Sequence, residues 1–313
     1  MIGDLFHMLI FPGFLFLVVF ALAAEWVDRK FCAKLQNRVG PPWYQPLADL
    51  IKLAAKEDLI PESVDRGMFM FTPTVALASV VTASLYMPIW GRQALFSFRG
   101  DVIVVLYLLT IPTVTFFLGG WYSRSVYSMI GAGRTLMQLF AYEIPLFVSI
   151  LAPALLANTW SISEMSSFYR DHGWLALFNV IGLGVSLVAL MGKLERVPFD
   201  IPEAETEIVA GSFTEYSGRL LAMFRLAISV EMIVGATLIG AVFLPFGLDF
   251  GPPIGFAFYL AKTLAIVAGL TVFRTVFARL RIDQMIDFCW KYVAPVAFVQ
   301  LLVDLVVKGI VTT

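Results

Sequence analysis

Eight long apolar runs constrain the fold of this chain more than any other feature. A bilayer core about 30 Å thick needs roughly 20 apolar residues per helix, and each run has about that length. Backbone polar groups must be paired inside lipid, and the alternating pattern of a membrane β-barrel is absent, so the runs should be helices. The sequence predicts an all-α, polytopic membrane protein with eight transmembrane helices. The expected spans are residues 5–24, 68–90, 102–121, 138–157, 174–192, 220–245, 254–277 and 291–310.

The composition excludes a water-soluble globule. The 313 residues are 59% hydrophobic and only 14% charged, and the mean hydropathy is +0.84. So little polar side chain cannot cover a soluble core, which makes the bilayer the solvent. Residues 1–4 lack the basic start of a cleavable signal peptide, so the first run should remain as a span. We expect a single membrane domain over residues 1–313, in contact with lipid. The net charge of −1, without a basic tract, argues against nucleic acid as a partner.

Basic residues gather on one side of the predicted bundle. Of the 22 Lys and Arg residues, sixteen fall in or beside loops 1, 3, 5 and 7, three in loops 2, 4 and 6, and three within spans. The positive-inside rule therefore places the odd-numbered loops in the cytoplasm and both termini outside the cell membrane. Loop 1, residues 25–67, contains PLADLIKLAAKE (46–57), whose apolar residues share one helical face. This pattern predicts an amphipathic helix on the cytoplasmic membrane surface.

The chain lacks the residues for a redox cofactor of its own. Its two cysteines, Cys32 and Cys289, and its two histidines, His7 and His172, are isolated from one another in the sequence. An iron–sulfur cluster normally takes four thiolates, and a structural zinc site takes four ligands. We expect no cofactor in this chain, so electron-transfer centres would belong to partner subunits.

Loop 5, residues 193–219, gathers six acids in an otherwise apolar sequence. Apolar residues and two prolines alternate with these acids, which is not typical of a free loop. We expect the segment to fold back against the bundle, with its acids lining a wet groove. Neighbouring carboxylates that are partly buried raise one another's pKa, which suits them to proton exchange. The acids are Glu195, Asp200, Glu203, Glu205, Glu207 and Glu215.

Further ionisable residues fall inside the predicted spans, where charge is costly and often functional. Glu143, in AYEIP, is favoured as a proton-relay residue. Glu231 and Lys262 are either relay groups or structural partners across helices. Asp304 and Lys308 are expected to form an i,i+4 pair on a helix surface.

Four blocks of this sequence resemble the large membrane subunit of complex I, known as the subunit 1 family. That family also includes the matching subunit of membrane-bound nickel–iron hydrogenases. The blocks follow the family's order along nearly the whole chain, and eight spans is the family's number. They are RVPFDIPEAETEIVAG (196–211) with EYSG (215–218), QNRVGPP (36–42) with QPLADLIKL (45–53), AYEIP (141–145), and RIDQM (281–285).

The resemblance implies a chamber that faces a peripheral electron-transfer arm, and an acidic path from it toward antiporter-like subunits. In complex I the chamber admits a quinone head group. The expected proton-path residues are Glu143, Asp200, Glu203, Glu205, Glu207 and Glu215, with Glu231 and Lys262 added from the spans. The expected chamber and docking residues are Glu25, Arg29, Arg38, Asp49, Arg134, Arg196, Arg219, Arg274, Arg279 and Arg281. No catalytic residue or metal ligand is implied in this chain.

Three departures favour the hydrogenase-like branch of the family. The GPPWYQPLAD junction is short, Glu195 directly precedes Arg196, and EYSGRLLAMFRLA carries Arg219 and Arg225. We therefore expect the membrane subunit of a membrane-bound hydrogenase or of a related ferredoxin-dependent sulfur-reducing complex. It would dock the peripheral arm and couple electron transfer to proton or sodium translocation, without being catalytic alone.

The resemblance also implies the partners and the cofactors that they carry. The partners would be hydrogenase-like large and small subunits, an iron–sulfur subunit and antiporter-like membrane subunits. Iron–sulfur clusters, and a nickel–iron centre in the hydrogenase case, would reside in those partners.

The sequence leaves other functions open. The chain could be the quinone-binding subunit of an oxidoreductase that uses NADH, a reduced deazaflavin or ferredoxin. It could instead be a stand-alone secondary transporter, which would be active in isolation. As a purely structural anchor, it would lose only assembly when its loop acids are neutralised.

Overall fold

The computed structural model describes residues 2–89, 93–247 and 252–312, and all the regular secondary structure in this part of the chain is helical. Eight of its helical segments are long and apolar enough to cross a membrane, which confirms the expected number of spans. The elements are α1 (Ile2–Leu9), α2 (Phe14–Leu35), α3 (Gln45–Ala55), α4 (Arg66–Ser84), α5 (Asp101–Tyr122), α6 (Val126–Ala157), α7 (Ile162–Asp171), the 3-10 helix η1 (Leu175–Asn179), α8 (Val180–Lys193), α9 (Glu205–Ile208), the 3-10 helix η2 (Gly211–Phe213), α10 (Gly218–Phe243), α11 (Pro252–Val276), α12 (Ile282–Phe288), the π-helical turn η3 (Cys289–Val293) and α13 (Ala294–Thr312).

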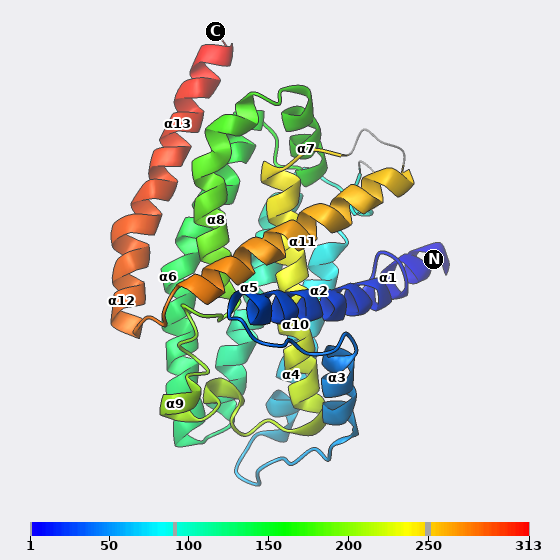
Figure 1. The fold of residues 1–313 in the computed structure, drawn as a ribbon, viewed down its shortest axis with the longest axis vertical. Coiled ribbons are helices and arrows are strands. Elements are labelled where there is room, and N and C mark those ends of the chain that lie inside the picture. Colours follow the sequence, from blue (N-terminus) through cyan, green and yellow to red (C-terminus); the bar gives the residue numbers. More distant parts are fainter. Residues whose placement is uncertain (1, 90–92, 248–251, 313) are drawn as a thin grey trace.

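The helices form a bundle around α10. Figure 1 shows α4, α6, α8 and α10 running along the long axis, while α2 and α11 cross the bundle obliquely. The spanning window of α10 is 94% buried, far more than that of any other described span. Small residues allow this close packing. A Cβ atom at Gly235, for example, would lie 2.5 Å from a methyl carbon of Leu190 on α8.

Two helices continue well past the apolar runs that predicted them. The helix α2 extends to Leu35, so Glu25 and Arg29 lie on a helix and not in loop 1. The helix α6 begins at Val126, so Arg134 lies on a helix and not in loop 3. Polar residues at these ends suggested loops, but they pack against other parts of the chain, which keeps the backbone helical. Helical stability in proteins comes largely from such packing.

The surface helix expected in loop 1 is α3, which covers Gln45–Ala55. Leu47 and Ile51 are exposed on one side of it. Leu50 and Leu53 face an internal cavity that is described below. The helix is therefore amphipathic, as predicted, and one of its faces closes part of the site.

Loop 5 folds back against the bundle, as expected from its apolar residues. Phe199, Ile201 and Ile208 are buried. The buried Gln138 amide of α6 donates to the carbonyl oxygens of Gly192 at 2.6 Å and Phe199 at 2.9 Å. These two hydrogen bonds attach the start of the loop to α6. This part of the loop is therefore held against the bundle.

The contact between α6 and η2 generates a stability prediction. A Cβ atom at Gly131 would lie 2.5 Å from the backbone nitrogen of Ser212, whereas one at Gly133 would meet nothing within 4 Å. We expect Gly131→Ala to lower the free energy of unfolding by about 1–3 kcal/mol, because backbone must move to make room. Gly133→Ala, on the same helix, is the matched control and should be neutral or slightly stabilising. Thermal unfolding of both purified variants checks this, and equal melting temperatures would contradict the close contact.

Candidate functional site

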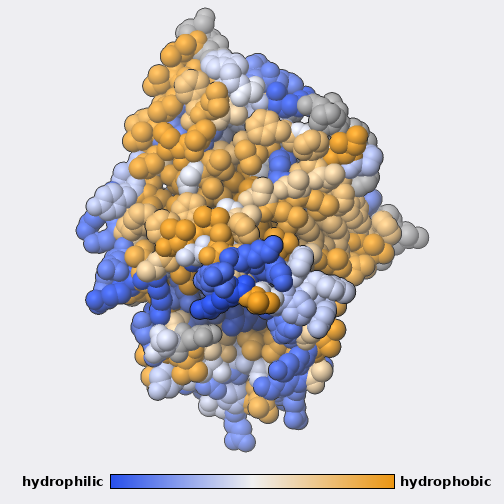
Figure 2. Space-filling model, in the orientation of Figure 1, coloured by the Kyte–Doolittle hydropathy of each residue, from blue (hydrophilic) through white to orange (hydrophobic). Residues whose placement is uncertain are grey.

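A charged cavity of about 520 Å³ lies between α2, α3, α10, α11 and the start of loop 5. Figure 2 shows that hydrophilic residues gather around the C-terminal end of α2 and toward the α3 end of the molecule, whereas apolar residues predominate in the opposite half, apart from a hydrophilic patch at its upper end. The cavity is lined by Leu22, Glu25, Asp28, Arg29, Pro46, Asp49, Leu50, Leu53, Leu194, Glu195, Arg196, Val197, Asp200, Glu203, Arg225, Leu226, Ile228, Ser229 and Arg274. Six carboxylates and four guanidinium groups therefore share one hollow.

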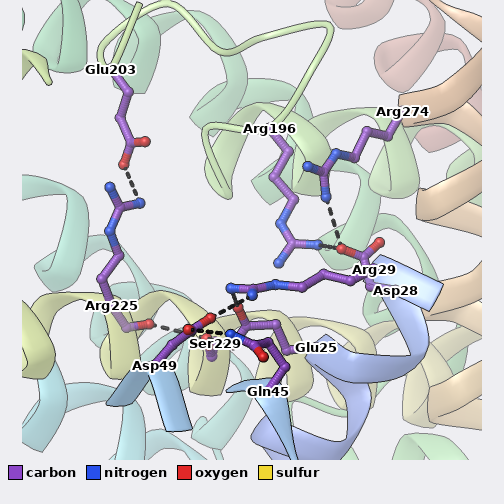
Figure 3. A network of polar contacts seen from close by, with 10 residues as sticks. All are labelled: Glu25, Asp28, Arg29, Gln45, Asp49, Arg196, Glu203, Arg225, Ser229 and Arg274. Atoms are coloured by element: carbon purple, nitrogen blue, oxygen red, sulfur yellow. Dashed lines mark hydrogen bonds and ion pairs between the residues drawn. The ribbon is translucent and has the colours of Figure 1, made fainter. Parts of the chain in front are cut away.

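Asp28 of α2 is the most deeply buried acid of this cavity. Its carboxylate accepts hydrogen bonds from Arg196 at 2.6 Å and from Arg274 at 2.9 Å (Figure 3). The Thr271 hydroxyl donates to it at 2.6 Å. Its side chain is 1% exposed. One carboxylate thus joins α2, loop 5 and α11, and two cations compensate its burial.

A second group of contacts connects α2 to α3 and α10. Arg29 forms ion pairs with Glu25, one helical turn before it, and with Asp49 of α3 at 2.8 Å. Gln45 also donates to Asp49, at 2.8 Å. The Ser229 hydroxyl of α10 donates to Glu25 at 2.9 Å. Figure 3 shows these side chains beside the Asp28 group, so two ion-pair clusters lie next to each other.

Loop 5 contributes the remaining acids of the cavity. Glu203 pairs with Arg225 of α10 at 2.8 Å. Glu195 is 7% exposed, and its Oε1 atom has no hydrogen-bond partner among the described residues. Burial, and then the negative charges of Glu203, Glu231 and Asp200, raise the pKa of Glu195 well above its usual range. Glu195 is therefore the loop acid best suited to hold a proton near neutral pH.

A fully buried ion pair lies beyond Glu195. Lys193, the last residue of α8, and Glu231 of α10 are 3.1 Å apart, with side chains 1% and 0% exposed. The Lys193 ammonium also donates to the Leu109 carbonyl. It lies 5.6 Å from the centre of the Tyr142 ring. The negative charge of Glu231 is one of the causes that raise the pKa of Glu195. A chain of ionisable groups therefore runs from the cavity into the bundle.

A smaller pocket of about 160 Å³ lies outside the main cavity, between α6, α9 and the segment before α12. Glu207 pairs there with Arg134 at 2.6 Å and with Arg279 at 3.3 Å. The hydrogen bond from Arg134 lowers the pKa of Glu207. Arg281 lines the same pocket and is highly exposed. These residues form a separate, more exposed charge cluster.

The structure thus separates the sequence-predicted residues into groups. The main cavity collects Glu25, Arg29, Asp49, Asp200, Glu203, Arg196 and Arg274. The smaller pocket collects Arg134, Glu207, Arg279 and Arg281.

Other predicted residues lie outside both hollows. Arg38 is exposed, and Glu143 and Glu215 are half-buried. Arg219 pairs with Asp58 at 2.7 Å. Lys262 donates to the Leu244 carbonyl, at the end of α10, at 2.8 Å. The side chain of Glu205 lies outside the described part of the structure.

Sequence reasoning missed three residues of the site. These residues are Asp28, Lys193 and Ser229. Each lies in or beside a segment that the sequence analysis discussed, but its partner in the structure lies far along the chain. Asp28 is 168 residues from Arg196 and 246 from Arg274. Asp28 follows the first apolar run and was expected in loop 1, so nothing in the local sequence indicated that it is buried between basic partners.

The described residues contain no group of three or more His, Cys, Asp and Glu side chains that could hold a metal ion. The cavity instead presents paired charges and an apolar wall from α3 and α10. Such a site can move protons, bind a polar head group or recognise a charged partner. The eight candidate spans and this charged cavity define a polytopic membrane protein that holds ionisable groups inside its helical bundle.

Comparison with known proteins identifies the family. The model of the NADH dehydrogenase family matches residues 8–305, so the chain belongs to that family. It is 31% identical over 316 residues to the H subunit of the NADH-quinone oxidoreductase of Carboxydothermus hydrogenoformans, covering 97% of this chain and 89% of that protein. The corresponding protein of Dehalococcoides mccartyi is 34% identical over 308 residues, covering 95% and 86% of the two chains.

A solved structure has the same fold. A chain from the structure of the membrane-bound sulfane sulfur reductase, an archaeal respiratory membrane complex, superposes with a TM-score of 0.85 and 25% identity. The match covers 93% of this chain and 96% of that one. These findings confirm the resemblance and the expected function at the level of a membrane subunit of a complex I-like oxidoreductase. They also agree with the hydrogenase-like branch.

The raised pKa of Glu195 generates a prediction about pH. The folded state binds this proton more tightly than the unfolded chain, whose glutamates titrate near pH 4.3. The stability of the folded state therefore falls as the pH rises above that value toward the raised pKa. Glu195→Gln removes this loss. We expect the variant to match the unchanged protein near pH 4.5 and to melt at a higher temperature near pH 8.

Glu207→Gln is the control with the opposite sign. Because the Arg134 hydrogen bond lowers the pKa of Glu207, its contribution to stability is present above the usual glutamate range and is lost as the pH falls. This variant should be slightly less stable near pH 8. The melting temperatures of the Glu195→Gln variant and the unchanged protein are compared at each pH. A difference between them that does not change with pH would contradict the proposed protonation of Glu195.

Proposed function

We propose that this chain couples electron transfer in a peripheral arm to proton or sodium movement across the cell membrane. The observation that carries the proposal is the chain of ionisable groups from the cavity to the buried Lys193–Glu231 pair. Charges inside a membrane bundle are costly, and paired, fully buried ones mark ion pathways in membrane proteins. The odd-numbered loops, with the cavity mouth, would face the cytoplasm.

The residues suggest how such coupling would operate. Glu195 takes a proton when negative charge appears nearby and releases it when that charge leaves. Its charge state then changes the electrostatic field on Glu231, which lies 3.1 Å from the Lys193 ammonium. A proton or charge displacement at the cavity is thereby passed toward Glu143 and the neighbouring membrane subunits. Each step is a shift between paired charges, which needs no cofactor in this chain.

The exposed part of loop 1 is suited to dock the peripheral arm. Val39 is 99% exposed and Trp43 is 72% exposed, and Leu47 and Ile51 of α3 continue the apolar surface. Isolated exposed apolar residues are normal, but a group of them beside a charged cavity marks an interaction site. The proposed partners are hydrogenase-like large and small subunits, an iron–sulfur subunit and antiporter-like membrane subunits. Iron–sulfur clusters, and a nickel–iron centre in a hydrogenase, would reside in those partners.

We favour the hydrogenase-like or sulfur-reducing branch. The short loop 1 junction and the adjacency of Glu195 and Arg196 support it, as does the likeness to the sulfane sulfur reductase chain. In this branch the cavity serves charge coupling, and no quinone needs to enter.

A quinone-binding role is the second candidate, and one observation favours it. The cavity has an apolar wall that includes Leu50 and Leu53 of α3 and Leu226 of α10, opposite guanidinium donors. Arg29 or Arg225 could donate hydrogen bonds to the carbonyls of a head group, while the leucines contact the ring. The curated relatives are named as subunits of NADH-quinone oxidoreductases.

The Lys193–Glu231 pair provides the direct test of coupling. Glu231→Gln or Lys193→Met alone leaves one buried charge or polar group without its partner, and should destabilise the complex by about 3–5 kcal/mol. The double variant Lys193→Met, Glu231→Leu removes both charges and should return stability to within about 1 kcal/mol of the unchanged protein. Electron transfer to the natural acceptor should continue in the double variant, whereas ion uptake into sealed vesicles should fall roughly tenfold or more.

The Asp287 and Lys291 ion pair, from α12 and the turn that follows it, offers a matched control. Both side chains are 63% exposed, so Asp287→Leu with Lys291→Met should change neither stability nor ion uptake measurably. If the buried double variant keeps full ion uptake, the pair is structural and the coupling proposal fails. If the isolated chain transports ions without partners, the stand-alone transporter is correct instead.

A further inference from the structure

The segment that follows α3 is attached to the first turn of α10. Figure 1 shows α3 beside the lower half of α10, with the chain after α3 passing below that half toward α4. This segment, residues 56–60, lines neither of the two hollows described above, and neither does the first turn of α10. The coupling proposed above assigns no role to either of them.

The side chain of Asp58 caps α10 from loop 1. Ser217 is the N-cap residue of α10, but its own side chain makes no capping hydrogen bond. Instead, the Asp58 carboxylate accepts a hydrogen bond from the backbone N–H of Arg219 at 2.6 Å. An N-cap side chain ordinarily accepts from this second helical position, so Asp58 takes the part of the N-cap from 161 residues earlier in the chain.

Two further contacts hold the same segment. The Arg219 guanidinium binds the other carboxylate oxygen of Asp58, from Nε at 2.8 Å and from Nη2 at 2.7 Å. The Ser217 hydroxyl accepts a hydrogen bond from the backbone N–H of Leu59 at 2.9 Å. Backbone and side-chain groups of the two segments therefore pair with each other.

Gly218 makes this close approach possible. Its φ angle is +57°, in the left-handed region that favours glycine. A Cβ atom there would lie 2.3 Å from Asp58 Oδ1 and 2.8 Å from the carbonyl oxygens of Lys56 and Glu57. The backbones of loop 1 and α10 are therefore in direct contact at this point.

This contact follows directly on the part of the cavity wall that α3 provides. Leu50 and Leu53 of α3 line the cavity, and Arg225 and Ser229 line it from α10. Asp58 lies five residues after Leu53. The attachment of Asp58 to α10 therefore determines where the C-terminal end of α3 lies relative to the opposite wall.

The other end of α3 is held by a different contact. Asp49 pairs with Arg29 of α2 at 2.8 Å. Between its ends, the 11-residue helix buries only Pro46 among its side chains. Isolated helices of this length are marginal in water, and most helical stability in proteins comes from packing. The position of α3 therefore depends on the contacts at its two ends.

We propose that Asp58 is a positioning residue of the cavity, because its cap on α10 holds the leucine wall of α3 against the charged wall of α10. This role rests on the proposed function, since it concerns the same cavity. Without the cap, α3 stays attached through Asp49 but is released at its C-terminal end, and water reaches the charges of the cavity. Water screens interactions between charges, so coupling through the cavity weakens.

Hydrogen–deuterium exchange of the purified native complex, read by mass spectrometry, tests the position of α3. In Asp58→Ala, the amides of α3 should exchange about tenfold faster, because the loss of hydrogen bonds to a charged group favours opening. Asp58→Asn keeps an oxygen that can accept from Arg219, so its exchange should be intermediate. Glu57→Ala removes the neighbouring, exposed acid and is the matched control, which should exchange like the unchanged protein. Unchanged exchange of α3 in Asp58→Ala, or faster exchange confined to residues 56–60, would overturn the positioning role.

A second variant tests the same contact without removing a charge. The Cβ atom of Gly218→Ala displaces residues 56–58 from α10, so α3 should again exchange faster. Gly133→Ala, whose Cβ atom meets nothing within 4 Å, should leave α3 unchanged. The unchanged complex gives a test that needs no variant. The amides of Leu59 and Arg219 should exchange within about tenfold of the last turn of α3, because one opening exposes all of them, and widely different rates would contradict the shared attachment.

Ion uptake per electron transferred, measured in sealed vesicles, is a readout that a purely structural cap would leave unchanged. It should fall in Asp58→Ala and recover in part in Asp58→Asn. Full uptake in Asp58→Ala, with uptake lost in the Lys193→Met, Glu231→Leu variant, would overturn the positioning role alone. Full uptake in both would contradict the proposed function, and the exchange of α3 would then decide by itself whether Asp58 fixes that helix.

Discussion

The arrangement of this bundle depends first on the buried carboxylate of Asp28. It is held by Arg196 and Arg274 and by a hydroxyl from α11, and these contacts join α2, loop 5 and α11 around one point. Taking such a charge out of water costs several kcal/mol, and removing one partner of a buried pair typically destabilises by about 3–5 kcal/mol. The oblique crossing of α2 and α11, and the fixed path of loop 5, both rely on this arrangement. The cavity exists because these elements cannot collapse onto each other without leaving charges unpaired.

Paired charge also determines how the site can work. Most acids of the cavity have a guanidinium partner, as Glu203 has in Arg225 at 2.8 Å. Glu195 differs, because burial and three neighbouring carboxylates act on it without a hydrogen-bond donor at Oε1. It lines the cavity and is two residues from Lys193 of the buried Lys193–Glu231 pair. We therefore propose that the charge of Glu195 is the one that changes during coupling.

The sequence predicted the architecture well because lipid leaves few choices. Apolar length identified all eight spans, and helical periodicity identified α3. Apolar length did not predict where a helix extends beyond its apolar run, as at Arg134 of α6, because packing and not apolar composition stabilises that part of the helix. Residue types and the family resemblance selected Glu25, Arg29, Asp49 and Glu203, which do meet in one cavity.

The remaining site residues depended on contacts that a single sequence does not reveal. The partners of Asp28 and Lys193 come from other helices, far along the chain. Asp304 was expected at a surface because its own helix offered Lys308, whereas the tertiary packing of α13 buries it. Local spacing predicts which side chains can meet along one helix, but only the arrangement of the bundle decides which faces are covered.

The central claim is that charge in this membrane protein links electron transfer to ion movement. The most direct measurement is ion uptake into sealed vesicles by the purified native complex supplied with reduced ferredoxin. Protons, polysulfide and a short-chain quinone would be offered separately as acceptors. We predict hydrogen or sulfide production accompanied by ion uptake, without quinone reduction. Inhibitor-sensitive quinone reduction would contradict the favoured branch, and turnover without any ion uptake would contradict coupling itself.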